Sequence, residues 1–205
     1  MRYAKDHKAE SRKKIVAAAS RTFRCNGIAA TGIDEVMRNA GLTKGAFSAH
    51  FRSKDDLVTA ALRDSMEHSP LFSLTAGEDT LEGLIFHYLT AAHRDHPQEG
   101  CPAAALAPEI ARLPGAIRET FAEGLGKMVS FVEARLPKGK TGAARREAAL
   151  SVLATMLGTL QLARLAGETE TSNHILKTGA QAALKLGREA APAAPPRGKR
   201  NARKG

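Results

Sequence analysis

The sequence predicts an all-α protein in two parts, an N-terminal domain of three helices and a larger helical C-terminal domain. Of its 205 residues 43% are apolar, only 4% are aromatic and Trp is absent. The core must therefore consist of Ala, Leu, Ile and Val, a composition that favours closely packed helices. Apolar side chains also recur at the i, i+3, i+4 spacing of helices along most of the chain.

The charge distribution indicates a polyanion-binding module at the N-terminal end. The net charge is +10; residues 1–66 contain 13 Lys and Arg against 7 Asp and Glu, and residues 188–205 contain 6 against 1. The segment between them is nearly balanced, which is typical of a nucleic-acid-binding domain on a neutral scaffold. A solvated basic surface is the alternative. We expect a flexible N-terminus over 1–8, a three-helix domain over 9–68, a helical domain over 69–188 and a disordered basic tail over 189–205.

The cysteine content and the N-terminus favour a reducing compartment. Two cysteines are too few for a disulfide scaffold. The charged N-terminus is not followed by a long apolar run, so neither a signal peptide nor a membrane span is expected. The sequence therefore predicts a cytoplasmic protein without a cofactor.

The N-terminal helices are bounded by clear start and stop signals. A first helix presents Ile15, Ala19 and Phe23 on one face and ends at the Asn-Gly pair of residues 26–27. In TGIDEVMRNAGL (residues 31–42), Thr31 and Asp34 have the spacing of a capping box for a short second helix.

The following segment, LTKGAFSAHFRSKDDL (residues 42–57), predicts two helix starts in close succession. Thr43 is placed to cap a helix from Lys44 to about His50, and Ser53 to cap another that begins at Lys54. A short helix, a Gly-containing turn of about four residues and a second helix form the helix-turn-helix of DNA-binding proteins, here over about residues 33–52.

The helix-turn-helix supplies the candidate DNA contacts. Helix N-termini offer N–H groups and a partial positive charge to phosphates. Lys44 adds a full charge that can meet a phosphate or a guanine edge, and the small Gly45 allows close approach to the groove. A helical hairpin that binds no nucleic acid is the alternative. The candidate residues are Thr31, Gly32, Thr43, Lys44, Gly45, Ala46, Ser48, His50 and Lys54.

This segment resembles the DNA-binding motif of the TetR family of bacterial transcriptional repressors. The resemblance rests on AGLT at residues 40–43, KG at 44–45, HF at 50–51 and SKDDL at 53–57, and covers about Ile15 to Leu62. At the position of Ser48 the family usually has a Tyr, and that Tyr often touches DNA. This departure bears on the operator sequence more than on binding itself.

The C-terminal part is predicted to be helical throughout, with helices within residues 81–92, 101–114, 115–137, 143–167 and 171–187. The last two are so broadly apolar that one protomer is not expected to cover them. We expect a second copy to supply the cover in a four-helix interface, and a monomer with internal packing is the alternative.

The resemblance implies a homodimeric repressor bound to a near-palindromic operator and released by a small ligand. A twofold dimer places its two reading helices about one DNA turn apart. The ligand chamber of the family lies between the DNA-binding domain and the dimer helices. Every candidate for its lining is also a plausible core residue: Phe72, Phe86, Tyr88, Cys101, Leu106, Ile110, Phe121, Leu125 and Met128.

A group of reactive residue types, His93, His96 and Cys101, raises three further hypotheses. A metal site lacks an evident fourth ligand, and a Cys–His hydrolase lacks an orienting partner, so an enzyme is not predicted. The segment from Gly100 to Glu109 also resembles electrophile-sensing TetR members, in which the Cys at the position of Cys101 is the sensor. A helix N-terminus and a protonated histidine would stabilise its thiolate. A buried apolar Cys is the alternative.

Overall fold

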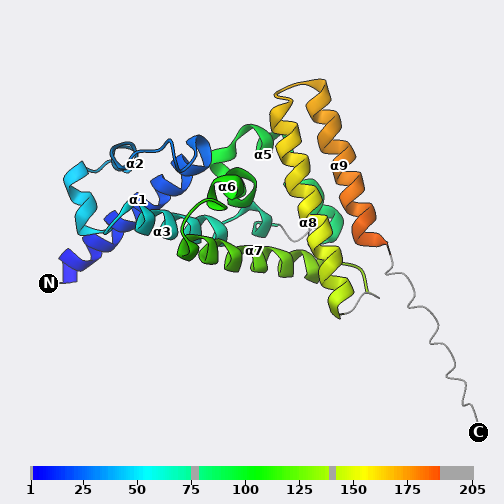
Figure 1. Ribbon diagram of the computed structural model, residues 1–205, viewed down its shortest axis with the longest axis horizontal. Helices are drawn as coiled ribbons and strands as arrows, with labels where there is room; N and C mark the ends of the chain where they lie inside the picture. Colours follow the sequence, from blue (N-terminus) through cyan, green and yellow to red (C-terminus); the bar gives the residue numbers. More distant parts are fainter. Residues whose placement is uncertain (1, 75–78, 139–141, 190–205) are drawn as a thin grey trace, which may run out of the picture.

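The computed structural model describes residues 2–74, 79–138 and 142–189, and every regular element in these ranges is a helix. The predicted fold class is therefore confirmed. Figure 1 shows an elongated arrangement, with the N-terminal helices at one end and the α8–α9 pair at the other. The predicted basic tail lies outside the described residues from position 190 onward.

The N-terminal domain consists of α1 (Arg2–Asn26), α2 (Ile33–Asn39), the 3₁₀-helix η1 (Lys44–Ala49) and α3 (Lys54–Glu67). Helix α1 extends back to Arg2, where no Gly or Pro interrupts it, and the flexibility expected over residues 1–8 stays a prediction. The helix ends at Gly27 with a positive φ of 85°, as the Asn-Gly stop signal predicted.

Two of the three predicted side-chain caps do not form. Thr31 is buried and its hydroxyl donates to the Gly27 carbonyl (2.6 Å), while Gly32 takes the N-cap position of α2. Thr43 occupies the N-cap position of η1, but its side chain makes no capping hydrogen bond. Ser53 does cap α3, since its hydroxyl accepts from the Asp56 N–H at 3.1 Å.

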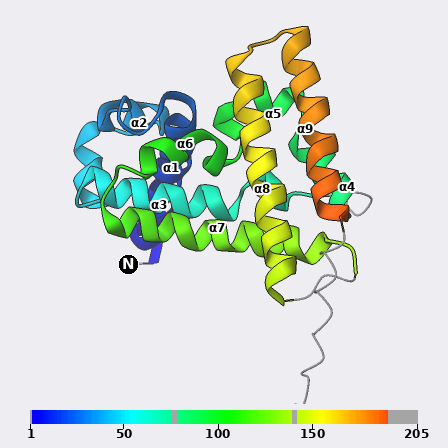
Figure 2. The ribbon, with the colours of Figure 1, turned by 45° about the vertical axis from the view of Figure 1, so that its right-hand side comes forward.

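The C-terminal domain contains η2 (Pro70–Phe72), α4 (Leu81–Tyr88), α5 (Ala91–Asp95), η3 (Pro97–Glu99), α6 (Pro102–Ile110), α7 (Gly115–Arg135), α8 (Gly142–Leu165) and α9 (Glu170–Arg188). The helix expected over residues 81–92 is divided into two. The hydroxyl of Thr90 accepts from the His93 N–H at 3.1 Å, and this cap begins a new helix. Figure 2 shows α3 and α7 side by side and α8 packed along α9.

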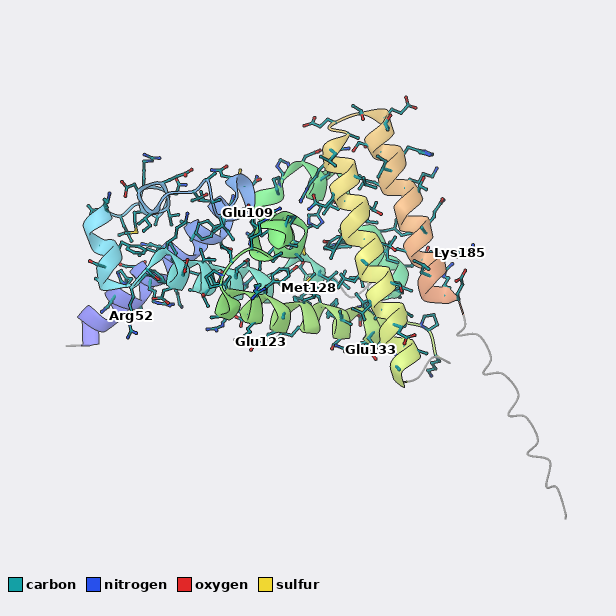
Figure 3. All side chains as sticks on the ribbon, viewed as in Figure 1. Arg52, Glu109, Glu123, Met128, Glu133 and Lys185 are labelled. Atoms are coloured by element: carbon teal, nitrogen blue, oxygen red, sulfur yellow. The ribbon has the colours of Figure 1, made fainter. Side chains whose placement is uncertain are left out.

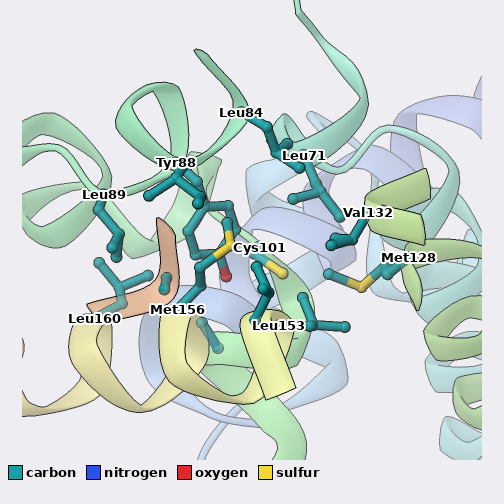
Figure 4. Close-up of a cluster of buried hydrophobic side chains, with 14 of the residues drawn as sticks. Leu71, Leu84, Tyr88, Leu89, Cys101, Met128, Val132, Leu153, Met156 and Leu160 are labelled. Atoms are coloured by element: carbon teal, nitrogen blue, oxygen red, sulfur yellow. The ribbon is translucent and has the colours of Figure 1, made fainter. Parts of the chain in front are cut away.

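A solid apolar core fills the C-terminal domain. It joins α4, the start of α6, α7, α8 and α9, with Tyr88, Cys101 and Met128 among its fully buried members. Figure 4 shows Cys101 in the middle of this cluster, surrounded by side chains from α4, α7 and α8. Three residues expected to line a ligand chamber are therefore packed core in this structure.

The N-terminal core extends across the predicted boundary at residues 68 and 69. Its centre is Ile15, Phe23 and Leu57, but Leu106 and Ile110 of α6 and Ile117 of α7 are buried in the same cluster. Helices α6 and α7 thus belong to both cores. The two domains are joined by continuous packing rather than by a linker, so a shift of α6 acts on both.

Helix α8 is long and apolar enough to cross a membrane when judged by length and composition alone. Within its most apolar window 44% is buried inside the fold. Core helices meet the same criteria, so this finding is weak evidence for a span, and the expectation of no membrane span stays a prediction.

Candidate nucleic-acid interface and effector region

The start of η1 presents the candidate DNA-binding residues that the structure exposes. Thr43, Lys44 and Gly45 are exposed at its first turn, Ser48 follows on the same helix, and Gly32 is exposed at the start of α2. The N-terminal ends of α2 and η1 are exposed to solvent because each helix buries only one face. Val36 of α2 and the partly buried Phe47 of η1 lie on these faces.

Lys44 forms an ion pair on this surface. Its Nζ lies 2.9 Å from Oδ2 of Asp34, and both side chains are largely exposed. An exposed pair of this kind contributes little to stability because water and salt screen it. The Lys44 ammonium is therefore able to exchange its carboxylate partner for a phosphate.

Among the described residues, two of the predicted DNA contacts, Thr31 and Lys54, make hydrogen bonds within the fold, and a third, His50, is partly buried. Thr31 is buried, as stated above. The Lys54 Nζ points inward and donates to the Ile28 carbonyl at 2.6 Å. His50 is partly buried with its Nδ1 lacking a hydrogen-bond partner, and burial, followed by the nearby Lys8 and Arg12, lowers its pKa. Whether any of them touches DNA stays a prediction.

Polar contacts fasten this domain to the C-terminal one. Arg21 forms an ion pair with Glu99 (3.2 Å), and the Arg24 guanidinium donates twice to the Gln98 carbonyl (3.0 and 2.7 Å). From α6, a Glu109 carboxylate oxygen accepts from the Ala29 N–H at 2.9 Å. Sequence reasoning missed all three, because each pair is more than 70 residues apart along the chain and no local pattern links its members.

Cys101 is buried at the edge of the apolar core, and its backbone N–H contacts a buried histidine. The Cys101 N–H donates to Nε2 of His93 (2.9 Å), and Nδ1 of His93 lies 2.7 Å from the Tyr88 carbonyl. Nε2 must therefore be unprotonated and Nδ1 must carry the proton. Burial lowers the pKa of His93 to about 4. His93 is therefore neutral and does not supply the protonated histidine expected beside Cys101, since desolvation disfavours its charged form. A role for His96 in stabilising a thiolate stays a prediction.

Arg164 of α8 is the cation of this region. Its guanidinium donates to the carbonyls of His93 (2.9 Å) and Arg94 (3.2 Å), and burial lowers its pKa. The Tyr88 hydroxyl is fully buried with no hydrogen-bond partner among the described residues, and burial raises its pKa well above the ordinary value. Figure 4 shows this hydroxyl close to the Cys101 and Met156 side chains.

The structure does not assemble the metal site of the alternative hypothesis. Both ring nitrogens of His93 serve backbone groups, and His96 is exposed. Over residues 2–74, 79–138 and 142–189, no group of three His, Cys, Asp or Glu side chains is placed to hold a metal ion.

The candidate ligand-binding residues do not form one chamber either. Phe86 is 48% exposed, because α4 turns it away from the core. Leu106 and Ile110 lie in the N-terminal core instead. Phe121 and Leu125 are partly buried against the C-terminal core, and Phe72 lines an open surface groove of about 850 Å³ together with Phe131. Their binding role stays a prediction.

Two family models match the chain. The model of bacterial regulatory proteins of the tetR family matches residues 15–61, and the model of the tetracyclin repressor-like C-terminal domain matches residues 77–178. A curated relative, the probable HTH-type transcriptional regulator ArpR of Pseudomonas putida, is 36% identical over 85 residues. The match spans 41% of this chain and only 40% of that protein.

Solved structures share the fold over nearly the whole chain. A TetR transcriptional regulator from Chloroflexus aurantiacus J-10-FL is 25% identical with a TM-score of 0.69, covering 88% of this chain and 97% of that one. The reduced form of E. coli NemR has a TM-score of 0.69 at 21% identity, covering 90% and 99%.

A more distant structure was solved with ligands. It is AibR in complex with isovaleryl coenzyme A and operator DNA, with a TM-score of 0.57 at 18% identity, covering 84% of this chain and 97% of that one. At this identity the likeness concerns the fold alone. The two family models, the sequence relative and the shared fold agree with the helix-turn-helix motif, and the chain belongs to the TetR family of bacterial transcriptional regulators.

Proposed function

We propose that this protein is a sequence-specific DNA-binding repressor that occupies a near-palindromic operator as a homodimer and leaves it when an effector binds. The observation that carries the proposal is the exposed start of η1, where Thr43, Lys44 and Gly45 combine free N–H groups, a cation and a small residue. These are the features that a helix needs to approach phosphates and base edges. The proposed repressor acts in a reducing cytoplasm.

The proposed dimer forms through α8 and α9. Along α8 an exposed stripe of apolar and small residues repeats at helical spacing. Leu162 is 58% exposed and Leu165 is 84% exposed, an unfavourable state for large apolar side chains in water. A second copy related by twofold symmetry removes this surface from water, and the small residues allow close approach. The stripe consists of Leu150, Ala154, Gly158, Leu162 and Leu165.

The proposed effector is a small, moderately hydrophobic compound that acts on the C-terminal core. Because Tyr88, Cys101 and Met128 are packed against one another, binding there requires helices to separate. Such a ligand favours a dimer shape that the operator does not accept, which is a population shift between two states. The acyl coenzyme A bound to AibR supports this general scheme but does not identify the compound here.

Modification of Cys101 is a second route that we propose for release. The thiol adds to the activated double bond of an electrophile, its sulfur bonds to one carbon and its proton moves to the adjacent carbon, so no oxidant is required. The adduct adds volume to a core that has no spare room, beside the Tyr88 hydroxyl and within the field of Arg164. Helices must move apart to accommodate it.

Mobility-shift assays with the DNA flanking the gene test the function. Wild-type protein should retard one fragment in the presence of excess competitor DNA, and absence of specific retardation would remove the proposal. N-ethylmaleimide then tests the cysteine route. It should release wild type and Cys25→Ser from DNA but not Cys101→Ser, because Cys25 is exposed at the far end of α1. Equal release of all three proteins would eliminate modification of Cys101 and leave a noncovalent effector.

A further inference from the structure

A single peptide group in the loop between α1 and α2 is held from both sides by charged side chains. Its carbonyl, that of Ile28, accepts from the Lys54 Nζ at 2.6 Å. Its N–H, that of Ala29, donates to Oε2 of Glu109 at 2.9 Å. A cation on the oxygen and an anion on the hydrogen match the two ends of the peptide dipole, and charge-assisted hydrogen bonds are the stronger kind.

The two side chains come from different domains. Lys54 is the first residue of α3, in the DNA-reading domain, whereas Glu109 lies near the end of α6, in the C-terminal domain. Figure 3 labels Glu109 where α6 meets the α1–α2 end of the molecule. Through this peptide group, the C-terminal domain forms a hydrogen bond with the segment that leads into the helix-turn-helix.

The loop fits closely around the Glu109 carboxylate. Gly27 has a φ of +85°, and a Cβ built on it would lie 2.5 Å from Oε1 of Glu109. The Thr31 hydroxyl closes the loop by donating to the Gly27 carbonyl at 2.6 Å. The backbone between α1 and α2 is therefore constrained at its start, in its middle and at its end, and the middle constraint depends on α6.

We propose that Glu109 is a positioning residue for DNA binding. It does not touch DNA; it holds the Ile28–Ala29 peptide, and through it α2 and η1, in the arrangement that fits the operator. The inference rests on the proposed function. It follows that a displacement of α6 changes the position of the helix-turn-helix through this hydrogen bond, since α6 runs from Pro102, directly after Cys101, to Ile110, directly after Glu109.

Three variants test the proposal. Glu109→Ala removes the acceptor, Glu109→Gln keeps an acceptor oxygen without the charge, and Glu123→Ala removes an exposed carboxylate from the neighbouring helix α7 (Figure 3). Glu109→Ala should bind the operator about tenfold more weakly than wild type, with Glu109→Gln within about threefold and Glu123→Ala unchanged. The salt dependence of operator binding by Glu109→Ala should keep the wild-type slope, because this variant loses no phosphate contact.

Hydrogen exchange measured by mass spectrometry supplies a readout without DNA. Peptides covering residues 28–39 should exchange faster in Glu109→Ala than in wild type and Glu123→Ala, while peptides from α8 and α9 should not change. Unchanged exchange at residues 28–39 overturns the proposal, as does operator affinity equal to wild type. If wild type itself binds no operator, the proposed function fails, and the exchange data still decide whether Glu109 holds the loop.

Discussion

The candidate DNA-binding surface at η1 and the surroundings of Cys101 both place polar groups at the start of a short helix, but the two regions differ in burial. At η1 the Lys44 charge is exposed and forms an ion pair with Asp34, whose side chain is also largely exposed. At α6 the Cys101 side chain is fully buried and its N–H is bonded to a neutral His93. Exposed charges remain available to a partner, whereas buried polar groups respond only when the packing around them opens.

The largest effect that we predict is a pH-dependent loss of folding stability caused by the buried His93. Unfolding lets His93 take up a proton, because its pKa is about 4 in the folded protein and about 6.5 when exposed. Its contribution to stability is complete above pH 6.5 and is lost as the pH falls towards 4, by roughly 3 kcal/mol. Thermal unfolding from pH 7 to 4 should show a steeper loss for wild type than for His93→Gln. An NMR titration that places the ring pKa near 6.5 would contradict the prediction.

The next effect concerns close approach of the exposed surface to DNA. Apart from its chain neighbours and the backbone of its own helix, no described atom lies within 4 Å of the place where a Cβ on Gly45 would lie, so Gly45→Val should leave the melting temperature unchanged. A branched side chain there holds η1 away from the groove and should weaken operator binding by roughly 2 kcal/mol. Fluorescence anisotropy measures the affinity, with Gly45→Ala as an intermediate. Full operator affinity in the valine variant would mean that η1 does not face the DNA.

A smaller effect is expected for the exposed charge itself. Lys44→Ala should weaken operator binding about tenfold at moderate salt and reduce the slope of log K against log[salt] by about one. Stability should not change, because the ion pair with Asp34 is exposed. Lys127→Ala on α7 is the charge-matched control and should bind like wild type. A wild-type salt slope in Lys44→Ala would exclude the phosphate contact.

The smallest predicted effect concerns the stability of the buried region around the Tyr88 hydroxyl. Tyr88→Phe removes a buried hydroxyl that has no hydrogen-bond partner among the described residues. The free energy of unfolding should stay within about 0.5 kcal/mol of wild type or rise, since the hydroxyl is already desolvated without compensation. Urea titration measures this. A loss above about 1 kcal/mol would show that the hydroxyl has a partner, for which the neighbouring Cys101 thiol is the candidate.

The local signals in the sequence were reliable where they concern backbone preference. The stop at Gly27 and the Ser53 cap were predicted because each depends on residues within one turn of the chain. The Thr31 capping box was wrong because the Thr31 hydroxyl donates instead to the Gly27 carbonyl, four residues earlier in the chain. Similarly, a continuous apolar stripe concealed the break between α4 and α5, which the Thr90 cap creates.

The candidate sites were predicted to different extents for the same reason. Lys44 and Gly45 are exposed as expected, because a helix-turn-helix leaves the start of its second helix in solvent. The chamber residues were chosen by size and apolarity, and these properties do not distinguish a core side chain such as Met128 from an exposed one such as Phe86. Pocket lining depends on which helices meet, and helical periodicity does not encode that.

By itself the sequence determined the all-helical class and the family, since composition, periodicity and a short motif act within a few turns of the chain. Only the tertiary structure decided that His93 is neutral, that Lys54 points inward and that Glu109 holds the Ala29 N–H. These properties arise from desolvation and from contacts between residues far apart in sequence. Both require that the helices have already packed.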